Sequence, residues 1–304
     1  MQDNLRYVNC NICNADDFTV IFPENKGQIH RIVKCNQCGL MYANPQTTGE
    51  IEGKNSLDDL DEETKDNAEI LDELSSFTRE KNQYLNKQYI QVKDHKPVLD
   101  FLEAFPKDNI LDVGAYSGNF LNEARIRGWE VIGLEPLAVP ALYAEREFGL
   151  TIIRKPLERA NLLPGSFKAI TSFHVIEHIY DPENFIREIH THLKPGGIMI
   201  LETPTYDSLT FKILKHRERS IRCNGHIYFF TRKTLKALVE KCGFDVLKHD
   251  RVGRTLTLDR LFTNIGIMLG NRNVFNKLSG FLKLENRTIH LNTGDMQRIY
   301  CRKK

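Results

Sequence analysis

The chain has 304 residues, of which 41% are hydrophobic and 27% charged, so it can hold one large α/β domain and a small module beside it. Its 42 lysines and arginines nearly balance its 40 acidic residues, and a net charge of +2 argues against a dedicated nucleic-acid binder. The first residues lack the basic-then-apolar layout of a secretion signal, and no apolar run is long enough for a transmembrane segment. These features predict a cytoplasmic protein.

Four of the seven cysteines stand in two close pairs near the start of the chain. Cys10-x-x-Cys13 and Cys35-x-x-Cys38 have the spacing of two zinc knuckles, and Gly39 suits the tight turn after the second pair. Four thiolates complete a closed tetrahedral site, which leaves no open position for chemistry. The spacing predicts a structural zinc ribbon over residues 1–48, with the other three cysteines as ordinary thiols.

The segment after the ribbon changes character, because residues 50–73 are dense in Asp and Glu. This composition predicts a solvated connector. Its continuation repeats apolar side chains at intervals of three and four, as an amphipathic helix beside a larger domain does: Ile70, Leu74, Phe77, Leu85 and Tyr89. We expect residues 49–96 to form this acidic linker and helical segment, and residues 97–304 to form the main domain.

From residue 98 onward, helix-like and strand-like stretches alternate. We expect helices near 97–104, 118–127, 137–148, 182–192 and 231–241, and strands at 109–113, 129–134, 151–153, 168–173, 197–202, 244–250 and 296–301. Such alternation predicts an α/β fold whose parallel sheet is covered on both faces. Near 255–285 a basic, amphipathic stretch predicts a helical insertion packed on the domain, with a lid over the site or a segment lying on a membrane as alternatives.

Residues 110–120, ILDVGAYSGNF, form an apolar run that breaks into a turn bracketed by Gly114 and Gly118. A strand, a glycine turn and a helix make a βα unit whose loop lets a ligand approach the backbone. Glu135 ends the next apolar run and is placed to accept hydrogen bonds from a ribose diol. The pair predicts a nucleoside site, and Tyr116 in place of the middle glycine of the dinucleotide fingerprint disfavours NAD.

The same segment resembles motif I of the class I S-adenosylmethionine-dependent methyltransferases. Asp112, Gly114 and Gly118 match that motif, and Tyr116 departs from its middle glycine. HVIEH from residue 174, LKPGG from residue 193 and GHIYFF from residue 225 follow in the order that the family shows, so the resemblance spans residues 98–302. It implies a methyltransferase with a Rossmann-like sheet of six parallel strands and one antiparallel strand, and S-adenosylmethionine as the methyl donor.

The resemblance and the strand ends together predict where the cofactor is bound. We expect contacts from the glycine turn, from the end of the second strand, from the loop after the third strand and from the HVIEH segment. The predicted cofactor-binding residues are Asp112, Gly114, Tyr116, Gly118, Glu135, Pro136, Glu158 and His174.

Methyl transfer to a hydroxyl requires a group that takes its proton, and histidine suits this near neutral pH. The candidates are His174, His178 and His226, with a narrow preference for His226 and His174, while Glu177 and His178 could instead order the loop. The letters His-x-x-Glu-His also describe a metalloprotease motif, which needs a helix, whereas a strand-like stretch precedes them here. Some relatives carry Glu-x-x-Glu-His here and hold a divalent cation, and the histidine at position 174 argues against that role.

Chains that join a zinc ribbon to this core, with segments like TPTYDSL at 203–209 and HIYF at 226–229, resemble bacterial enzymes of sugar, polysaccharide and secondary-metabolite pathways. That resemblance implies a small hydroxylated acceptor such as a nucleotide sugar. A cationic cluster fits an anionic acceptor and fits a solvated loop equally well: Lys212, Lys215, Arg217, Arg219 and Arg222. The alternatives are a carbon-methylating nucleotide-sugar enzyme, a non-catalytic interaction protein and an RNA methyltransferase.

Overall fold

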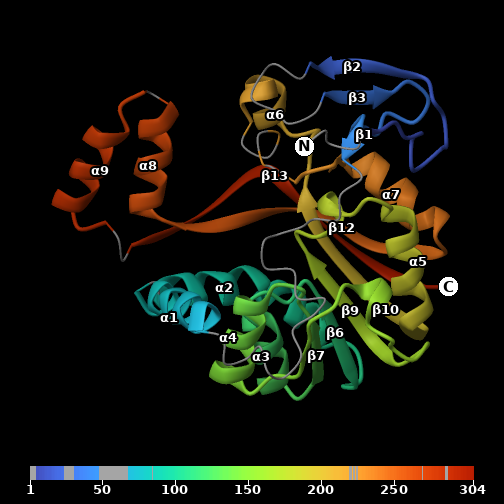
Figure 1. Cartoon of the computed structure of the whole chain (residues 1–304), viewed down its shortest axis with the longest axis horizontal. Coiled ribbons are helices and arrows are strands. Elements are labelled where there is room, and N and C mark those ends of the chain that lie inside the picture. The colour runs from blue at the N-terminus through green and yellow to red at the C-terminus, as the bar shows by residue number, and fades with distance from the viewer. Residues whose placement is uncertain are drawn as a thin grey trace.

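A computed structural model of the chain describes residues 5–23, 31–47, 68–83, 85–218, 221, 223, 225–268, 270–284 and 287–304. Seven strands form one sheet in the order β12-β13-β10-β9-β6-β7-β8 (Figure 1). β13 is antiparallel to both of its neighbours, and the other six strands run parallel to one another. The predicted Rossmann-like sheet is therefore confirmed.

The strands of this sheet lie close to the predicted ranges. They are β6 (Asn109–Val113), β7 (Glu130–Leu134), β8 (Ile152–Ile153), β9 (Phe167–Phe173), β10 (Leu193–Pro204), β12 (Phe244–Thr257) and β13 (Thr288–Lys303). The last two extend well beyond the predicted strands at 244–250 and 296–301. Their outer halves contain few apolar side chains, with only a short alternation at Ile289 and Leu291 in β13, and the backbone pairing of one strand with the other extends them.

Helices cover both faces of the sheet (Figure 1). α2 (Leu85–Leu102), α3 (Asn119–Ile126) and α4 (Ala138–Phe148) lie over one face, and α5 (Pro182–His192) and α7 (Arg232–Lys241) lie over the other. In β10, Ile198 and Ile200 are buried in the first layer, while Met199 and Leu201 are buried in the second. This alternation at every second residue explains why the strand is apolar throughout.

The N-terminal segment joins the main domain through a second sheet. β2 (Phe18–Phe22), β3 (Ile32–Cys35) and β4 (Met41–Ala43) form a four-stranded sheet with β11 (Tyr228–Phe229), which comes from the far half of the chain. Tyr228 pairs with Tyr42, and Phe229 pairs with Met41. A short strand pair, β1 (Leu5–Arg6) with β5 (Gln46–Thr47), completes the segment. The predicted ribbon is thus continuous, by backbone pairing, with a strand near the expected acceptor side.

Part of the predicted connector, residues 49–67, lies outside the described residues. The helical continuation is α1 (Ala68–Gln83), which packs on α4 as expected: Ile70, Leu74 and Phe77 contact a group that includes Val139 and Tyr143. The side chains of residues 85 and 89 are not described. The predicted helix at 97–104 is the end of the longer α2, which begins at Leu85 and contains Pro97.

α8 (Leu258–Met268) and α9 (Arg272–Phe281) fill the predicted helical insertion. The expectation that they pack on the domain is wrong. The two helices pack on each other at the end of the long β12–β13 hairpin and project away from the sheet, at the left of Figure 1. We call residues 252–296 the arm. Among the described residues, no helix is long and apolar enough to cross a membrane.

Candidate functional site

A cavity of about 930 Å³ opens at the carboxyl ends of β6, β7, β9 and β10. Parallel α/β sheets bind ligands at this edge. Most of the residues predicted from the sequence line it together: Asp112, Gly114, Tyr116, Glu135, Pro136, Glu158, His174 and His178. The three remaining predicted residues of the main domain, Gly118, Glu177 and His226, do not line it.

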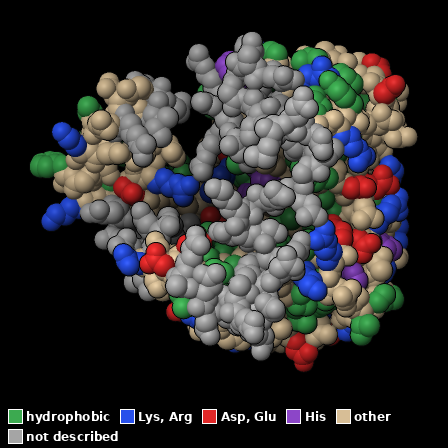
Figure 2. All heavy atoms as spheres, viewed as in Figure 1, with side chains coloured by type: hydrophobic (Ala, Val, Ile, Leu, Met, Phe, Trp, Pro, Cys, Tyr) green, Lys and Arg blue, Asp and Glu red, His purple; other side chains and the backbone are tan. Residues whose placement is uncertain are grey.

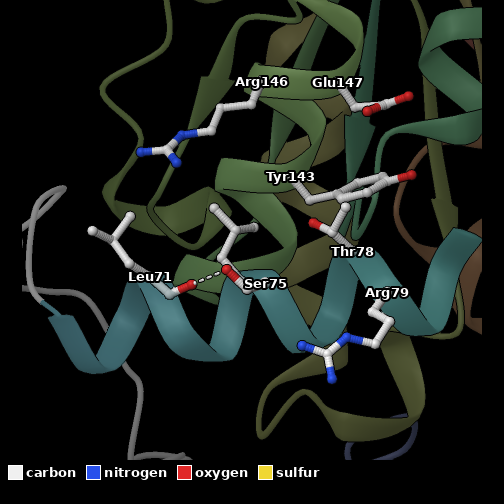
Figure 3. Close-up of a pocket in the computed structure, with 8 residues that line it drawn as sticks. Leu71, Ser75, Thr78, Arg79, Tyr143, Arg146 and Glu147 are labelled. Carbon is white, nitrogen blue, oxygen red and sulfur yellow. Dashed lines mark hydrogen bonds between the residues drawn. The ribbon is translucent and has the colours of Figure 1, made fainter.

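A second hollow, of about 1010 Å³, lies between α1 and α4 (Figure 3). Leu71 and Ser75 face it from α1, and Tyr143, Arg146 and Glu147 belong to the α4 side. The described residues that line it include no strand end and no glycine turn. The cavity at the sheet edge is therefore the candidate functional site.

Glu135 follows β7 and is nearly buried, at 5% exposure. Its Oε2 accepts a hydrogen bond from Tyr116 N at 2.7 Å, and its Oε1 accepts one from Leu137 N at 2.9 Å. Burial raises the pKa of Glu135, and these two backbone donors oppose that rise. Each carboxylate oxygen keeps a second lone pair, so the side chain can accept two further hydrogen bonds from a diol in the cavity.

Gly114 and Gly118 are both left-handed, with φ of 81° and 72°, but they serve different purposes. A Cβ on Gly114 would lie 2.4 Å from Val175 Cγ2, so this glycine allows the loop after β9 to approach the turn. A Cβ on Gly118 would lie 2.8 Å from Ala144 Cβ, so that glycine allows α3 to begin against α4. Gly118 therefore shapes the turn from behind the cavity.

Tyr116, which replaces the middle glycine of motif I, also adopts a left-handed conformation, with φ of 47°. A tyrosine adopts this region at a cost of about 1 kcal/mol. The side chain is 43% exposed, and its ring lies edge-on to Phe77 of α1, with the centroids 5.8 Å apart. The turn thus keeps a glycine-like backbone while its side chain reaches the flanking helix.

Asp112, at the end region of β6, is 2% exposed and accepts a hydrogen bond from Thr171 Oγ1 at 2.7 Å. Burial raises its pKa to about 7, and nearby Glu135 adds to the rise. Because the folded protein holds this proton more tightly than the unfolded chain does, the contribution of Asp112 to stability is greatest below pH 4 and is lost as the pH rises through 7.

We expect Asp112→Asn to be more stable than the wild type at pH 8, by up to about 4 kcal/mol, and to lose this advantage at pH 4. Urea unfolding of both proteins across this pH range measures the difference. Asp108→Asn is the control, because Lys194 lowers the pKa of Asp108 and its ionisation does not change above pH 5. A stability difference for Asp112→Asn that stays constant with pH would contradict the assignment.

His174 follows β9 in a left-handed conformation, with φ of 60°. Its Nδ1 lies 3.5 Å from Glu177 Oε1 and its Nε2 lies 3.5 Å from Glu202 Oε1. The surrounding protein alone would lower the pKa of His174, but the two carboxylates outweigh it and raise the pKa to about 9. Glu202 also pairs with Arg298, whose Nε donates to it at 2.6 Å. His174 is therefore a cation at neutral pH.

His178 ends a short 3-10 turn (Ile176–His178), so the HVIEH segment spans a strand end and a loop, as predicted, and not one helix. Its Nδ1 donates to Gly225 O at 2.9 Å, which leaves the lone pair on Nε2. The ring of His226 lies edge-on to the ring of His178, with the centroids 4.7 Å apart.

Glu177 is buried beside this pair, at 1% exposure. Its side chain accepts a hydrogen bond from Thr203 Oγ1 at 2.9 Å, and Ile227 N donates to its backbone oxygen.

The ligand atoms of Glu177, His178 and His226 lie within 4.8 Å of one another, close enough for a metal ion. His174 does not belong to this group. The four N-terminal cysteines form the other such group in the described residues: Cys10, Cys13, Cys35 and Cys38. The sulfur atoms of Cys10 and Cys38 are 3.3 Å apart, and those of Cys13 and Cys35 are 3.5 Å apart. These separations fit four thiolates around one zinc ion, with bonds of about 2.3 Å.

Several residues that were not predicted as site residues also line the cavity: Asp94, His95, Phe120, Glu202 and Arg254. His95 comes from α2 and its ring is stacked on Phe173, with the centroids 4.4 Å apart. Burial lowers the pKa of His95 to about 4, so its ring is neutral. Of these residues, Glu202 is the one that the sequence could have indicated, because a charged residue inside an apolar strand implies a buried partner of opposite charge. That partner, Arg298, comes from β13.

Comparison with known proteins assigns the chain to a family. The family described as "Methyltransferase domain" matches residues 79–249. A ubiquinone biosynthesis O-methyltransferase of Pseudomonas paraeruginosa is 36% identical over 102 residues, which are 31% of this chain and 43% of that protein. A tRNA U34 carboxymethyltransferase of Psychromonas ingrahamii is 28% identical over 160 residues, 49% of this chain and 47% of that protein. The chain spans less than half the length of these curated relatives.

Two solved structures share the fold. A Thermotoga maritima protein, described as an S-adenosylmethionine-dependent methyltransferase and possible histamine N-methyltransferase, gives a TM-score of 0.50 at 19% identity over 77% of this chain and all of its own. A chain from the complex of the Haloferax volcanii Trm112 activator with a methyltransferase gives 0.55 at 14% identity over 77% of this chain and 96% of its own. The match of the family to more than half of the chain shows that this protein belongs to the S-adenosylmethionine-dependent methyltransferases.

Proposed function

We propose that the protein transfers a methyl group from S-adenosylmethionine to a hydroxyl oxygen of a small acceptor held in the cavity at the sheet edge. The observation that carries this proposal is that one cavity contains both Glu135 and the histidines at positions 174 and 178. Methyl transfer is an in-line displacement, so donor and acceptor must share one space. The acceptor oxygen forms a bond to the methyl carbon, the bond to sulfur breaks and the acceptor proton leaves.

In this proposal, the donor lies over the glycine turn, with its ribose hydroxyls on Glu135. Pro136 and Glu158 line the same end of the cavity and would contact the adenosine. Gly114 would let the backbone of the turn come close to the donor, and Tyr116 would flank the methionine part of the donor. Asp112 and Gly118 would hold the shape of the turn from beneath.

We propose His178 as the group that takes the acceptor proton. Its Nδ1 donates to a backbone carbonyl, so the lone pair is on Nε2, and its side chain lines the cavity. His174 fits this role less well because two carboxylates hold it protonated, and its positive charge would instead stabilise negative charge on the acceptor oxygen. His226 and Glu177 would keep the ring of His178 in place.

His178→Gln is expected to lower kcat about 100- to 10,000-fold and to leave S-adenosylhomocysteine affinity unchanged. Initial-rate assays with an acceptor identified by screening measure kcat, and calorimetry measures the affinity for S-adenosylhomocysteine. His190→Gln, on α5 and outside the cavity lining, is the matched control and should keep full activity. Wild-type turnover by His178→Gln would remove this residue from the proton-transfer role.

The acceptor itself is best found by a screen. Of the relatives named above, none is a sugar-modifying enzyme by its description, so the nucleotide-sugar acceptor stays a prediction from the sequence. One of them is named for tRNA, so the screen should contain RNA beside phenols and nucleotide sugars. A mass gain of one CH₂ unit identifies the product, and its fragmentation tells oxygen from carbon or nitrogen. Methylation of carbon or nitrogen alone would contradict the proposal.

We also propose that the four cysteines bind one structural zinc ion, within a ribbon over residues 1–48 that precedes the linker at 49–96 and the catalytic domain at 97–304. The support is the close grouping of the four sulfur atoms and the turn at Gly39, where Gly39 N donates to Cys35 O at 3.0 Å. Because the protein fills all four positions, this ion would hold the fold and take no part in the reaction.

A further inference from the structure

The arm carries an apolar stripe that the described residues leave uncovered. On α9, Val274 is 60% exposed, Leu278 42%, and Phe281 83%, and Leu282 directly after the helix is 46% exposed. Intervals of four and three residues place the first three on one side of the helix. A phenylalanine ring that is four-fifths exposed beside three exposed aliphatic side chains forms a continuous apolar patch. Such a patch marks an interaction surface, whereas single exposed apolar residues do not.

This stripe is distinct from the side of α9 that packs on α8. Phe275 contacts Phe262 of α8, with the ring centroids 6.3 Å apart, and Ser279 is 4% exposed. These two residues lie about a quarter of a turn or more from the stripe on the helix. The helix therefore uses one side to hold the arm together and presents the other to the outside.

Positive charges surround the stripe. Lys277 lies one position before Leu278, Lys283 follows Leu282, and Arg287 begins the return to β13, all exposed. Along α8 and α9, the described acidic residue is Asp259, at the far end of the pair. Blue Lys and Arg side chains stand around the projecting pair at the left of Figure 2, with green hydrophobic atoms at its outer edge. The arm thus joins an exposed apolar stripe to a cationic rim.

We propose that α9 docks the protein on an anionic lipid bilayer, with Val274, Leu278 and Phe281 entering the interface and Lys277 and Lys283 contacting lipid head groups. An amphipathic helix that lies in a membrane surface has this composition, with bulky apolar residues on one side and lysines beside them. A second copy of the chain suits the stripe less well, because a twofold contact would bring one cationic arm against another.

Docking in this way would also place the catalytic cavity near the lipid. The arm leaves the sheet beside the cavity, since Gly253 and Arg254 of β12 are among its lining residues. Beyond a register shift between Val252 and Arg254, the hairpin is paired again, with Arg254 facing Leu291 and Thr257 facing Thr288. A docked arm is therefore joined to the edge of the cavity through β12. The inference does not depend on the acceptor.

Vesicle sedimentation tests the proposal with the full-length chain. We expect binding to phosphatidylcholine vesicles that contain about 30% phosphatidylglycerol to be at least about 10-fold tighter than binding to pure phosphatidylcholine, and to weaken as salt rises. Leu278→Ser with Phe281→Ser should reduce binding at least about 10-fold. Lys277→Glu with Lys283→Glu should reduce it about as much.

The matched control is Ile126→Ser with Leu163→Ser, since these side chains are 69% and 76% exposed elsewhere on the molecule, and it should bind vesicles as the wild type does. Unchanged affinity for S-adenosylhomocysteine shows that each variant is folded. Vesicle binding that survives both arm variants would overturn the proposal. So would a wild-type dimer, measured by light scattering, that Phe281→Ser converts to a monomer while no vesicle binding is seen.

Discussion

Glu135→Ala is expected to weaken S-adenosylhomocysteine binding about 10- to 100-fold, as measured by calorimetry. The carboxylate follows β7 and lines the cavity, and each of its oxygens has a lone pair left after accepting one backbone hydrogen bond. Loss of two charge-assisted hydrogen bonds to a ribose accounts for the size of the effect. The variant also leaves the amides of Tyr116 and Leu137 without their acceptor, so part of the loss could come from a disturbed turn.

Two further variants separate these causes. Glu135→Gln keeps one oxygen for the backbone and removes the charge, and we expect it to lose affinity nearly as much. Glu130→Gln, at the exposed start of the same strand, should bind as the wild type does. If Glu135→Gln retained full affinity, the carboxylate would be a support of the turn and the ribose contact would be wrong.

Cys35→Ser is expected to abolish zinc binding at the ribbon and to lower methyl transfer about 100-fold or more, while S-adenosylhomocysteine affinity changes by no more than about twofold. The reason is the shared sheet. Ile227 donates to Glu177 O and accepts from Ala43 N, so β4 of the ribbon supports the segment that carries His226. The proposed donor end of the cavity is built from β6 and β7, which do not pair with the strands of the N-terminal segment.

Metal analysis, turnover and calorimetry on the same preparation test this separation. Cys223→Ser, which changes an exposed cysteine outside the four-cysteine group, should retain zinc and activity. If Cys35→Ser lost zinc and kept normal turnover, the ribbon would not position the acceptor side. If it lost donor affinity in proportion to turnover, the ribbon would support the whole domain and no particular site.

Local sequence was a sound guide where a segment's own residues decide its structure. Asp181 accepts from Asn184 N and precedes Pro182, so α5 begins where predicted. Thr231 and Thr234 cap α7 in the same way. The outer halves of β12 and β13 and the direction of the arm were missed, because each strand is extended by pairing with the other. No single-segment pattern contains that information.

For the site, the sequence by itself predicted the end of the cavity where we propose that the methyl donor binds: a glycine turn and an acid at the next strand end are joined by the short-range geometry of a βα unit. It also determined the four-cysteine cluster, since knuckle spacing is local. Tertiary structure decided the opposite end, where we propose that the acceptor binds. There, His95 comes from α2, Glu202 needs Arg298 from β13, and His178 takes its tautomer from Gly225 O. These contacts join residues far apart in the chain, and only packing of the whole sheet brings them together.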